Sequence, residues 1–351
     1  MAQPSPPPAR PASTMRQVRQ VLVPLHLSAQ LPPAGSCVQR LAGASMGTSW
    51  SVQAALAPDA LAPLAGALQQ QLETVVAQMS HWDADSTLGR FNRAQAGSWH
   101  ALPDEFFTVL DYALAVGADS AGAYDPCGGA LVNLWGFGAQ RRYDQVGFQA
   151  PAGAAIDAVL AQRAHAHILF DRPGRRLRQP GGVQLDLSSV AKGFAVDQLA
   201  RCLEAQGILH YLVEIGGELR GAGMQPNGAP WWVALEGIPD ASACAQSVIA
   251  LHGMAVATSG DYRRHFDYAG RRASHTLDPR SGYPIHNDVA AVSVLHRDCM
   301  AADALSTALS VLGIDAGLAF AEWHQLAARF LLRRGAALEE HISSAWRAML
   351  Q

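Results

Sequence analysis

The chain has 351 residues, and 49% of them are hydrophobic, which is enough for a sizeable core in one large domain or in two smaller ones. The formal net charge is −3, and no cluster of lysine and arginine indicates a nucleic-acid surface or a polybasic membrane patch. The 5 cysteines are far apart and form no C-x-x-C pair. A disulfide framework or a zinc site is therefore not expected, and a reducing compartment is favoured.

Residues 1–40 differ in composition from the rest of the chain. The opening segment MAQPSPPPARPAST is rich in proline and predicts a disordered tail over residues 1–40. The apolar run at residues 21–31 is interrupted by Pro24 and His26, so it is a poor signal-peptide core. No stretch is long and apolar enough to be expected to span a membrane. Without a convincing export signal the cytoplasm is the favoured location, with a periplasmic or membrane-associated location as the alternative.

Folding signals begin near residue 41. Apolar residues at helical spacing predict helices at residues 58–80, 103–120, 151–164, 189–205 and 301–312. Predicted strands are residues 45–56 and, after residue 166, the segments HILF, VQLDL, YLVEI, WWVAL, MAVAT and VAAVSVL. Because the strands cluster without a strict strand–helix alternation, the sequence predicts an α+β fold with a largely antiparallel sheet.

The segment LDLSSVAKGFAVDQLA, residues 185–200, predicts a strand-to-helix corner. Asp186 ends the strand, Ser188 or Ser189 is a good N-cap, and Lys192 adds positive charge near the first turn. Free backbone N–H groups at such a helix start favour an anion such as phosphate. The alternative is a capped helix without a ligand. The S-x-x-K spacing of penicillin-binding enzymes also occurs here, but no K-T-G or S-D-N partner accompanies it.

Two further stretches carry turn chemistry. In YLVEIGGELRGAG a strand runs into Gly216 and Gly217, which allow positive φ and the close approach of a ligand. Residues 257–284 form the densest polar stretch, with His275 and Asp278 near one another. A histidine in this setting is suited to act as a general base or to bind phosphate. The alternative is a solvated hairpin whose polar residues only shape the backbone.

Asp303 and Thr307 interrupt an otherwise apolar predicted helix. Their i, i+4 spacing places both side chains on one face. A carboxylate and a hydroxyl are hard oxygen ligands that suit Mg²⁺ better than zinc. The alternative is that Asp303 caps the helix start and that Thr307 bonds back to a carbonyl group.

Taken together, these stretches resemble the ApbE family, the FAD:protein FMN transferases, in order from Met46 to about residue 313. The matching segments are MGTSW, MSHWDADSTLGRFN, YDPCGGALVNLWGFG, LDLSSVAKGFAVD, ATSGDYRR, SHTLDPRSGYP and AADALSTALSVLG. The chain departs from the family pattern mildly, with Cys127 in place of a threonine and Glu218 in place of an aspartate.

The resemblance implies an α+β fold and an activity. Family members bind FAD and Mg²⁺ and transfer the FMN half of FAD to a Thr or Ser of a target flavoprotein, releasing AMP. The alternatives are hydrolysis of FAD to FMN and AMP, or flavin binding without turnover. The expected domain spans residues 41–351, as one unit or as two lobes with the FAD site between them. No nucleic-acid partner is expected, and membrane contact is expected only through the acceptor.

The resemblance also implies roles for individual residues. The expected FAD contacts are Met46, Trp82, Ala123, Tyr124, Asp125, Asp186, Lys192 and His275. The expected metal ligands are Asp303, Thr307 and Ser189, the last through its carbonyl oxygen. For the general base we rank His275 first and Asp278 second.

Overall fold

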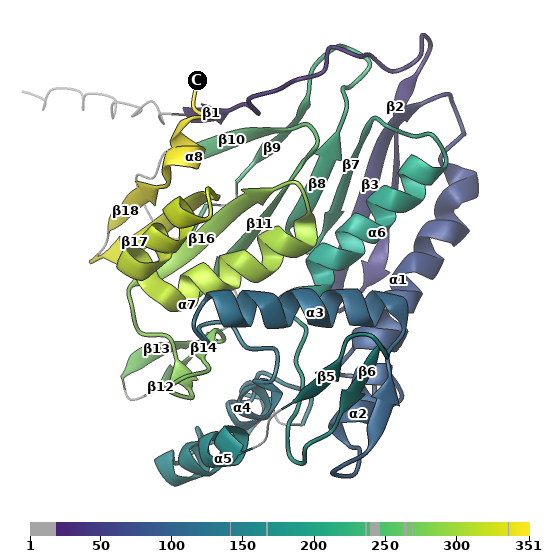
Figure 1. The fold of residues 1–351 in the computed structure, drawn as a ribbon. Helices are drawn as coiled ribbons and strands as arrows, with labels where there is room; N and C mark the ends of the chain where they lie inside the picture. Colours follow the sequence, from purple (N-terminus) through teal and green to yellow (C-terminus); the bar gives the residue numbers. More distant parts are fainter. Residues whose placement is uncertain are drawn as a thin grey trace, which may run out of the picture.

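The computed structural model describes residues 19–140, 142–165, 168–235, 237–238, 246–262, 265–268, 270–335 and 337–351. Its largest element is an eight-stranded sheet with the strand order β18-β17-β16-β11-β8-β7-β3-β2 (Figure 1). These strands are β2 (Cys37–Ser45), β3 (Thr48–Leu56), β7 (Tyr211–Ile215), β8 (Glu218–Ala222), β11 (Met254–Gly260), β16 (Val289–His296), β17 (Ala327–Arg334) and β18 (Ala337–Ile342). Every neighbouring pair in this sheet is antiparallel, which confirms the predicted α+β class with a largely antiparallel sheet.

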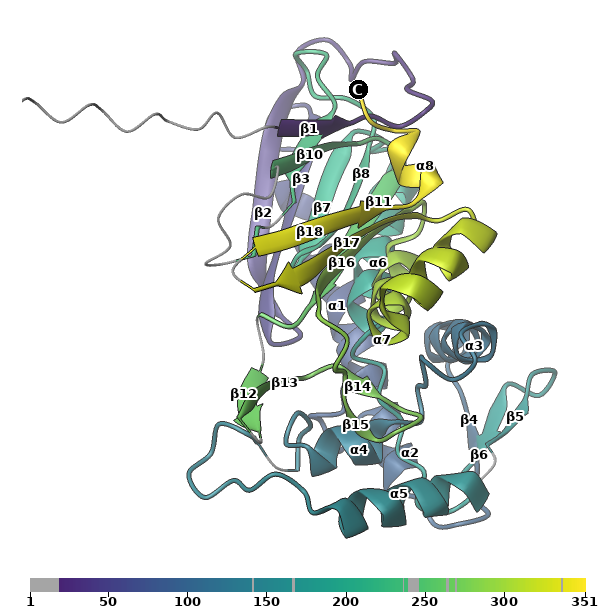
Figure 2. The same ribbon diagram turned by 90° about the vertical axis from the view of Figure 1, so that its left-hand side faces the viewer.

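Three helices lie on one face of this sheet, as the side view shows (Figure 2). They are α1 (Ala65–Met79), α6 (Ala191–Ala205) and α7 (Cys299–Trp323). A fourth helix, α3 (Asp104–Asp119), packs against α1 and α7. α7 packs on β11 and β16, α6 packs on β7 and β8, and the two helices contact each other. Because side chains alternate along a strand, residues such as Val213 and Ala257 face these helices while their neighbours face the other side.

The opposite face of the sheet is covered by a second, smaller layer. It contains the sheet β1-β10-β9 and the short helix α8 (Ser344–Arg347), with β1 (Arg19–Leu22), β9 (Trp231–Ala234) and β10 (Gln246–Leu251). Leu22 and Trp346 are fully buried here among the outward-facing residues of the large sheet. The hydrophobic residues under the helices and those under this smaller layer therefore form two separate clusters, one on each face of the large sheet.

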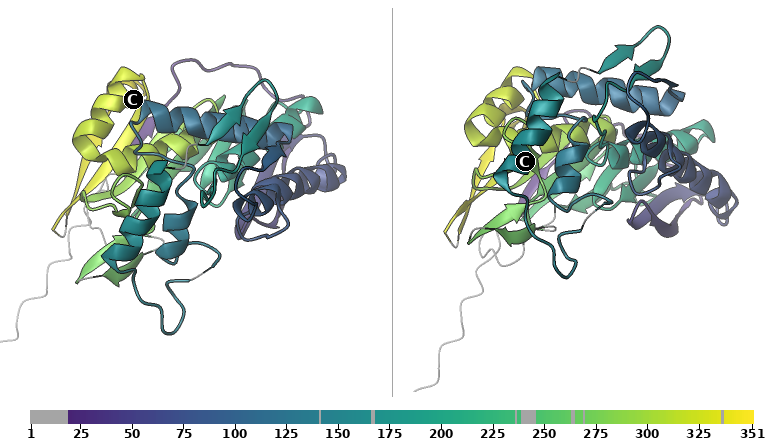
Figure 3. Two further views of the ribbon diagram at one scale, coloured as in Figure 1. Left: turned by 60° about the horizontal axis from the view of Figure 1, so that its bottom comes forward. Right: turned by 90° about the horizontal axis from the view of Figure 1, so that it is seen from below.

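A group of short elements lies below the sheet in Figure 1. It contains α2 (Thr87–Asn92), α4 (Gly129–Leu134), α5 (Gly153–His165), β4 (Trp99–Ala101), β5 (Leu169–Asp171), β6 (Arg176–Arg178), β12 (His265–Tyr268), β13 (Arg271–Ser274), β14 (Leu277–Asp278) and β15 (Tyr283–Pro284). The short helix η1 (Ala62–Leu64) is not part of this group and directly precedes α1. Seen from below, α4 and α5 lie side by side (Figure 3). The indole nitrogen of Trp135 donates to the Gly282 carbonyl at 2.8 Å, which joins the segment after α4 to the segment around β14 and β15.

α7 is longer than the predicted helix at residues 301–312. It has 25 residues and a kink at Gly313, where φ is 75°. With a mean hydropathy of 1.6 it is long and apolar enough, by length and composition alone, to cross a membrane, which differs from the sequence-based expectation. In the structure this composition has another cause, because the helix packs on the sheet and against its neighbours α3 and α6.

The N-terminal region also departs from the prediction. Residues 1–18 lie outside the described residues, but β1 pairs in parallel with β10, and β2 already begins at Cys37. The disordered tail predicted for residues 1–40 is therefore wrong where these two strands lie. The apolar run that made a poor signal-peptide core instead places Leu22 in the smaller hydrophobic layer.

Other differences concern short segments. The predicted strand VQLDL forms no strand, because Leu185 bonds to the Asn92 side chain and Asp186 N–H bonds to the Pro126 carbonyl. β2, β17 and β18 were not predicted as separate strands. His167, the first residue of the predicted strand HILF, lies outside the described residues, and β5 covers the end of that segment.

Candidate active site

The crossing of α6 and α7 is the centre of the site. A Cβ atom added to Gly193 would lie 2.3 Å from the Cys299 carbonyl oxygen and 2.8 Å from Asp303 Cβ. Glycine at this position therefore allows the two helices to approach closely. The Gly193 N–H donates to Asp303 Oδ2 at 2.9 Å, so the carboxylate of α7 faces the first turn of α6.

Asp303 does not cap its own helix. The α7 start is capped by Asp197 of α6, whose carboxylate accepts hydrogen bonds from the Cys299 N–H at 3.0 Å and the Met300 N–H at 2.9 Å. Arg220 of β8 donates to the same carboxylate at 2.7 Å. The alternative in which Asp303 serves as the cap is therefore wrong, and its carboxylate is available for another purpose.

Asp303 is 4% exposed, and burial raises the pKa of its carboxyl group, while the Lys192 ammonium partly opposes the rise. Lys192 forms an ion pair with Glu218 of β8, which is also 4% exposed. Burial raises the pKa of Glu218 to about 7, and the charge on Asp303 adds to this rise although Lys192 lowers it. Glu218 Oε2 is buried without a hydrogen-bond partner in the described part of the chain. Two buried carboxylates thus share one nearby ammonium group.

Thr307 lies one turn beyond Asp303 on α7. Its hydroxyl is 2.9 Å from the Ser259 hydroxyl of β11, rather than bonded back to a helix carbonyl as the alternative had it. Ser259 also lies 2.8 Å from the hydroxyl of Ser306, which is fully buried. The sheet and the helix are therefore linked by hydroxyl groups at the position of the predicted ligand.

The segment before α6 brings Ser189 and Tyr124 together. The Ser189 hydroxyl donates to the Tyr124 hydroxyl at 3.0 Å. Burial raises the pKa of Tyr124 far above its usual range, and the nearby charges of Asp303 and Asp186 add to the rise. The helix begins at Ala191 without a side-chain cap, so the prediction that Ser188 or Ser189 is the N-cap is wrong.

Asp186 itself closes a turn. Its Oδ1 accepts from the Ser188 N–H at 2.8 Å and lies 3.8 Å from Nδ1 of His81. His81 is adjacent to Trp82, and the centroids of the two rings are 5.0 Å apart. Trp82 is 52% exposed, so a flat apolar surface is open to solvent beside the helix start.

Asp125 connects two distant segments through Arg163 of α5. Arg163 forms an ion pair with Asp125 and donates to the Pro279 carbonyl at 3.0 Å. The other carboxylate oxygen of Asp125 accepts from the Cys127 N–H at 2.8 Å. Ala123, two residues before Asp125, is buried, so its side chain belongs to the core.

The two candidate bases have different surroundings. Asp278 and Arg280 form a bidentate ion pair, in which both N–O distances are 2.9 Å. His275 stands edge-on to Phe137, with ring centroids 6.2 Å apart. The Asp278 carboxylate thus has a cationic partner two residues further along the chain, and the ranking of His275 above Asp278 stays a prediction.

Met46 occupies the two-residue turn between β2 and β3. Its φ is 53° and that of Gly47 is 73°, which is the geometry of a tight β-hairpin turn. A Cβ on Gly216 would lie 2.9 Å from Thr48, so this hairpin packs against the Gly-Gly turn that precedes Glu218. Met46 therefore lies at the tip of a hairpin that contacts the Gly-Gly turn.

Comparison with known proteins decides the family. A sequence model described as the ApbE family matches residues 46–330. The chain belongs to the ApbE family. An FAD:protein FMN transferase of Vibrio cholerae is 36% identical over 313 residues, covering 88% of this chain and 92% of the relative. An FAD:protein FMN transferase of Salmonella typhimurium is 33% identical, covering 90% of this chain and 91% of the relative.

A solved structure agrees. The apo crystal structure of the Pseudomonas stutzeri flavinyl transferase ApbE has a TM-score of 0.81 and 39% identity, covering 90% of this chain and 97% of that chain. The ApbE-family fold expected from the sequence is thereby confirmed.

The described residues hold no group of three or more His, Cys, Asp or Glu side chains arranged to bind a metal ion. The predicted donor set of this family member is of a different kind, with one carboxylate, one hydroxyl and one carbonyl oxygen. Mg²⁺ commonly takes few protein ligands and completes its shell with water and phosphate oxygens. The excess of buried negative charge around Asp303 and Glu218 also fits a cation at this crossing.

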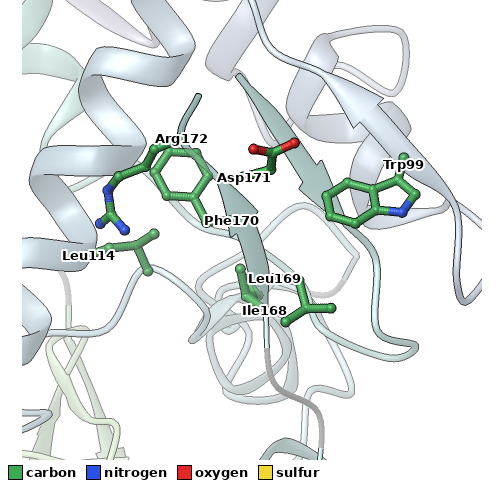
Figure 4. Close-up of a pocket in the computed structure, with 7 residues that line it drawn as sticks. All are labelled: Trp99, Leu114, Ile168, Leu169, Phe170, Asp171 and Arg172. Carbon is green, nitrogen blue, oxygen red and sulfur yellow. The ribbon is translucent and has the colours of Figure 1, made fainter. Parts of the chain in front are cut away.

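Figure 4 shows a surface pocket of about 520 Å³. It is lined by Trp99, Leu114, Ile168, Leu169, Phe170, Asp171 and Arg172. None of the predicted site residues lines it, so the grouping of buried charges and hydroxyls identifies the candidate site better than pocket size does.

Sequence reasoning did not single out several residues of the site. Glu218 was noted only as a departure from the family pattern, and Arg163, His81 and Ser259 were given no role. Each acts through a partner far away in the chain, as Arg163 does through Asp125 and Pro279. The one available signal was for Glu218, a charged residue directly after the Gly216-Gly217 turn, at the start of β8.

Proposed function

We propose that this protein is an FAD:protein FMN transferase, which transfers the FMN half of FAD to a Thr or Ser of a target flavoprotein and releases AMP. One observation carries the proposal beyond family membership. The buried Asp303 carboxylate, the Lys192 ammonium and the N-terminal turn of α6 converge on one place. This combination suits a pyrophosphate that gains charge during transfer.

We propose Mg²⁺ as the cation of this site, held by Asp303, Thr307 and the carbonyl oxygen of Ser189. When bound, Mg²⁺ neutralises charge on the pyrophosphate oxygens. The chemistry of the donor set and the buried, incompletely compensated carboxylates support this assignment.

The remaining roles belong to side chains that bind or orient. Lys192 offers its ammonium group to the phosphates, and the ion pair with Glu218 holds its side chain. The other proposed FAD contacts are Met46, Trp82, Ala123, Tyr124, Asp125 and Asp186. Of these, the exposed ring of Trp82 offers a flat surface against which an aromatic ring system can stack.

His275 is our proposed general base. It would accept the proton of the incoming Thr or Ser hydroxyl as that oxygen attacks the FMN-side phosphorus. Asp278 is the second choice because Arg280 already pairs with it. Contact with a membrane is expected only through the acceptor protein.

Incubation with FAD, Mg²⁺ and a candidate acceptor flavoprotein tests the proposal. Covalent flavin fluorescence on the denatured acceptor, together with AMP release, is the expected result. Free FMN and AMP formed without labelling of the acceptor would instead identify a hydrolase. Unchanged FAD with each acceptor tried would contradict both activities.

A further inference from the structure

Three hydroxyl groups connect β11 to α7 beside Asp303. The Ser259 hydroxyl of β11 lies 2.8 Å from that of Ser306 and 2.9 Å from that of Thr307. The Ser306 hydroxyl in turn donates to the backbone carbonyl of Asp303 at 2.9 Å. β11 and α7 lie side by side, so these contacts join two rigid elements (Figure 1).

The number of available hydrogens fixes the direction of each hydrogen bond among these three hydroxyl groups. A serine or threonine hydroxyl has one hydrogen to donate and two lone pairs to accept with. The hydrogen of Ser306 goes to the Asp303 carbonyl, because a carbonyl oxygen can only accept. The bond between Ser259 and Ser306 must then use the hydrogen of Ser259. The bond between Ser259 and Thr307 must therefore use the hydrogen of Thr307.

This order has a consequence for Thr307. With its hydrogen directed at Ser259, its oxygen keeps its lone pairs for another partner. A cation binds to lone pairs and is repelled by an O–H hydrogen, so a hydroxyl ligand has to direct its hydrogen elsewhere. The Ser306 hydroxyl is fully buried and already both donates and accepts a hydrogen bond. It therefore fixes the direction of the other two hydrogen bonds and is not a cation ligand.

We propose that Ser259 is a positioning residue that orients the Thr307 hydroxyl for cation binding. The proposal rests on the cation site of the proposed function and adds a residue for which the sequence indicated no role. Partners of this kind, which hold a metal ligand in place, change metal affinity by about 10–100-fold when they are removed.

Mn²⁺ binding to the purified full-length protein, followed by electron paramagnetic resonance without FAD, tests this role. We expect Ser259→Ala to weaken Mn²⁺ binding about tenfold or more. Ser259→Thr keeps a hydroxyl, so its Mn²⁺ affinity should stay within about threefold of that of the wild type. This change is much smaller than the one expected when the partner of a metal ligand is lost. The matched control is Ser293→Ala. The Ser293 hydroxyl of β16 lies 2.8 Å from the hydroxyl of Thr258, the residue before Ser259 on β11.

Ser306→Ala provides an independent variant should Ser259→Ala fold poorly. Without its acceptor, Ser259 can turn its hydrogen toward Thr307, which directs the Thr307 hydrogen away from β11. Ser306→Ala should therefore also weaken Mn²⁺ binding, and by more than Ser293→Ala does.

The outcomes separate the two levels of the proposal. Unchanged Mn²⁺ affinity in Ser259→Ala, or an equal loss in Ser293→Ala, would overturn the positioning role while leaving the cation site in place. Absence of Mn²⁺ binding to the wild type would overturn the cation site itself, and the role of Ser259 with it.

Discussion

The α6–α7 crossing and the segment around His275 differ in how firmly their polar groups are held. At the crossing, Asp303 is 4% exposed and is bonded to the backbone of another helix. Around His275, Asp278 of the short strand β14 is paired with Arg280, only two residues further along the chain in the turn after that strand. The groups proposed to meet the pyrophosphate are thus built into the core, whereas the groups proposed to meet the acceptor are partly exposed. Changes in the first region should affect both stability and activity, and changes of His275 or Asp278 should affect activity more than stability.

The largest expected effect is that of Asp303→Asn. Asparagine keeps the shape and can still accept the Gly193 N–H, but it loses the charge that a cation requires. We expect Mg²⁺-dependent FMN transfer to fall by about 100-fold or more. The measurement is the rate of acceptor flavinylation at saturating FAD. Asp315→Asn, an exposed change further along α7, is the control and should leave the rate unaltered.

His275→Ala should separate binding from chemistry. Because the imidazole is proposed to take a proton only during transfer, FAD affinity should change far less than the transfer rate, which should fall about 100-fold. Flavin fluorescence titration and single-turnover labelling measure the two quantities. Asp278→Asn should have the smaller effect on rate, and a reversed order of the two variants would assign the base to Asp278.

Gly193→Ala tests the close packing of the crossing. The added methyl group would lie 2.3 Å from the Cys299 carbonyl oxygen, so the helices must separate. We expect the free energy of unfolding to fall by about 1–3 kcal/mol in urea titrations. Gly66→Ala on α1 is the matched control, because nothing lies within 4 Å of the added atom. That change should raise stability by about 0.5–1 kcal/mol, and a loss of similar size in both variants would contradict the packing argument.

The last expected effect is a pH dependence of stability that arises from Glu218. Its pKa in the folded protein is raised from 4.5 to about 7, so the folded state holds a proton that the unfolded state has released between these values. The free energy of unfolding should therefore fall as pH rises from about 5 through 7 and level off above about 8. Glu218→Gln should reduce this fall by about 2 kcal/mol between pH 5 and pH 8. Parallel pH profiles of the two proteins would contradict the raised pKa.

Local patterns in the sequence were sufficient for much of this account. The antiparallel α+β class follows from clustered apolar strands, and the shared face of Asp303 and Thr307 follows from helical spacing alone. The family resemblance added the order of the segments, which the comparisons confirm.

Features that depend on tertiary contacts were not predictable in the same way. Ser259 and Thr307 are 48 positions apart, and only the pairing of β11 with α7 brings them together. The cap of α7 comes from Asp197, 102 positions before Cys299, so local capping rules pointed to the wrong carboxylate. The segment VQLDL has the composition of a strand, yet its backbone bonds go to the Asn92 side chain and to Pro126.

The central claim is that the α6–α7 crossing holds the cation on which FMN transfer depends. Flavinylation of an acceptor, measured for the wild type and Asp303→Asn over a series of Mg²⁺ concentrations, tests it most directly. We expect a saturable rise in rate for the wild type and no response to Mg²⁺ for the variant. A wild-type rate that is independent of Mg²⁺, or the same Mg²⁺ curve for both proteins, would contradict it.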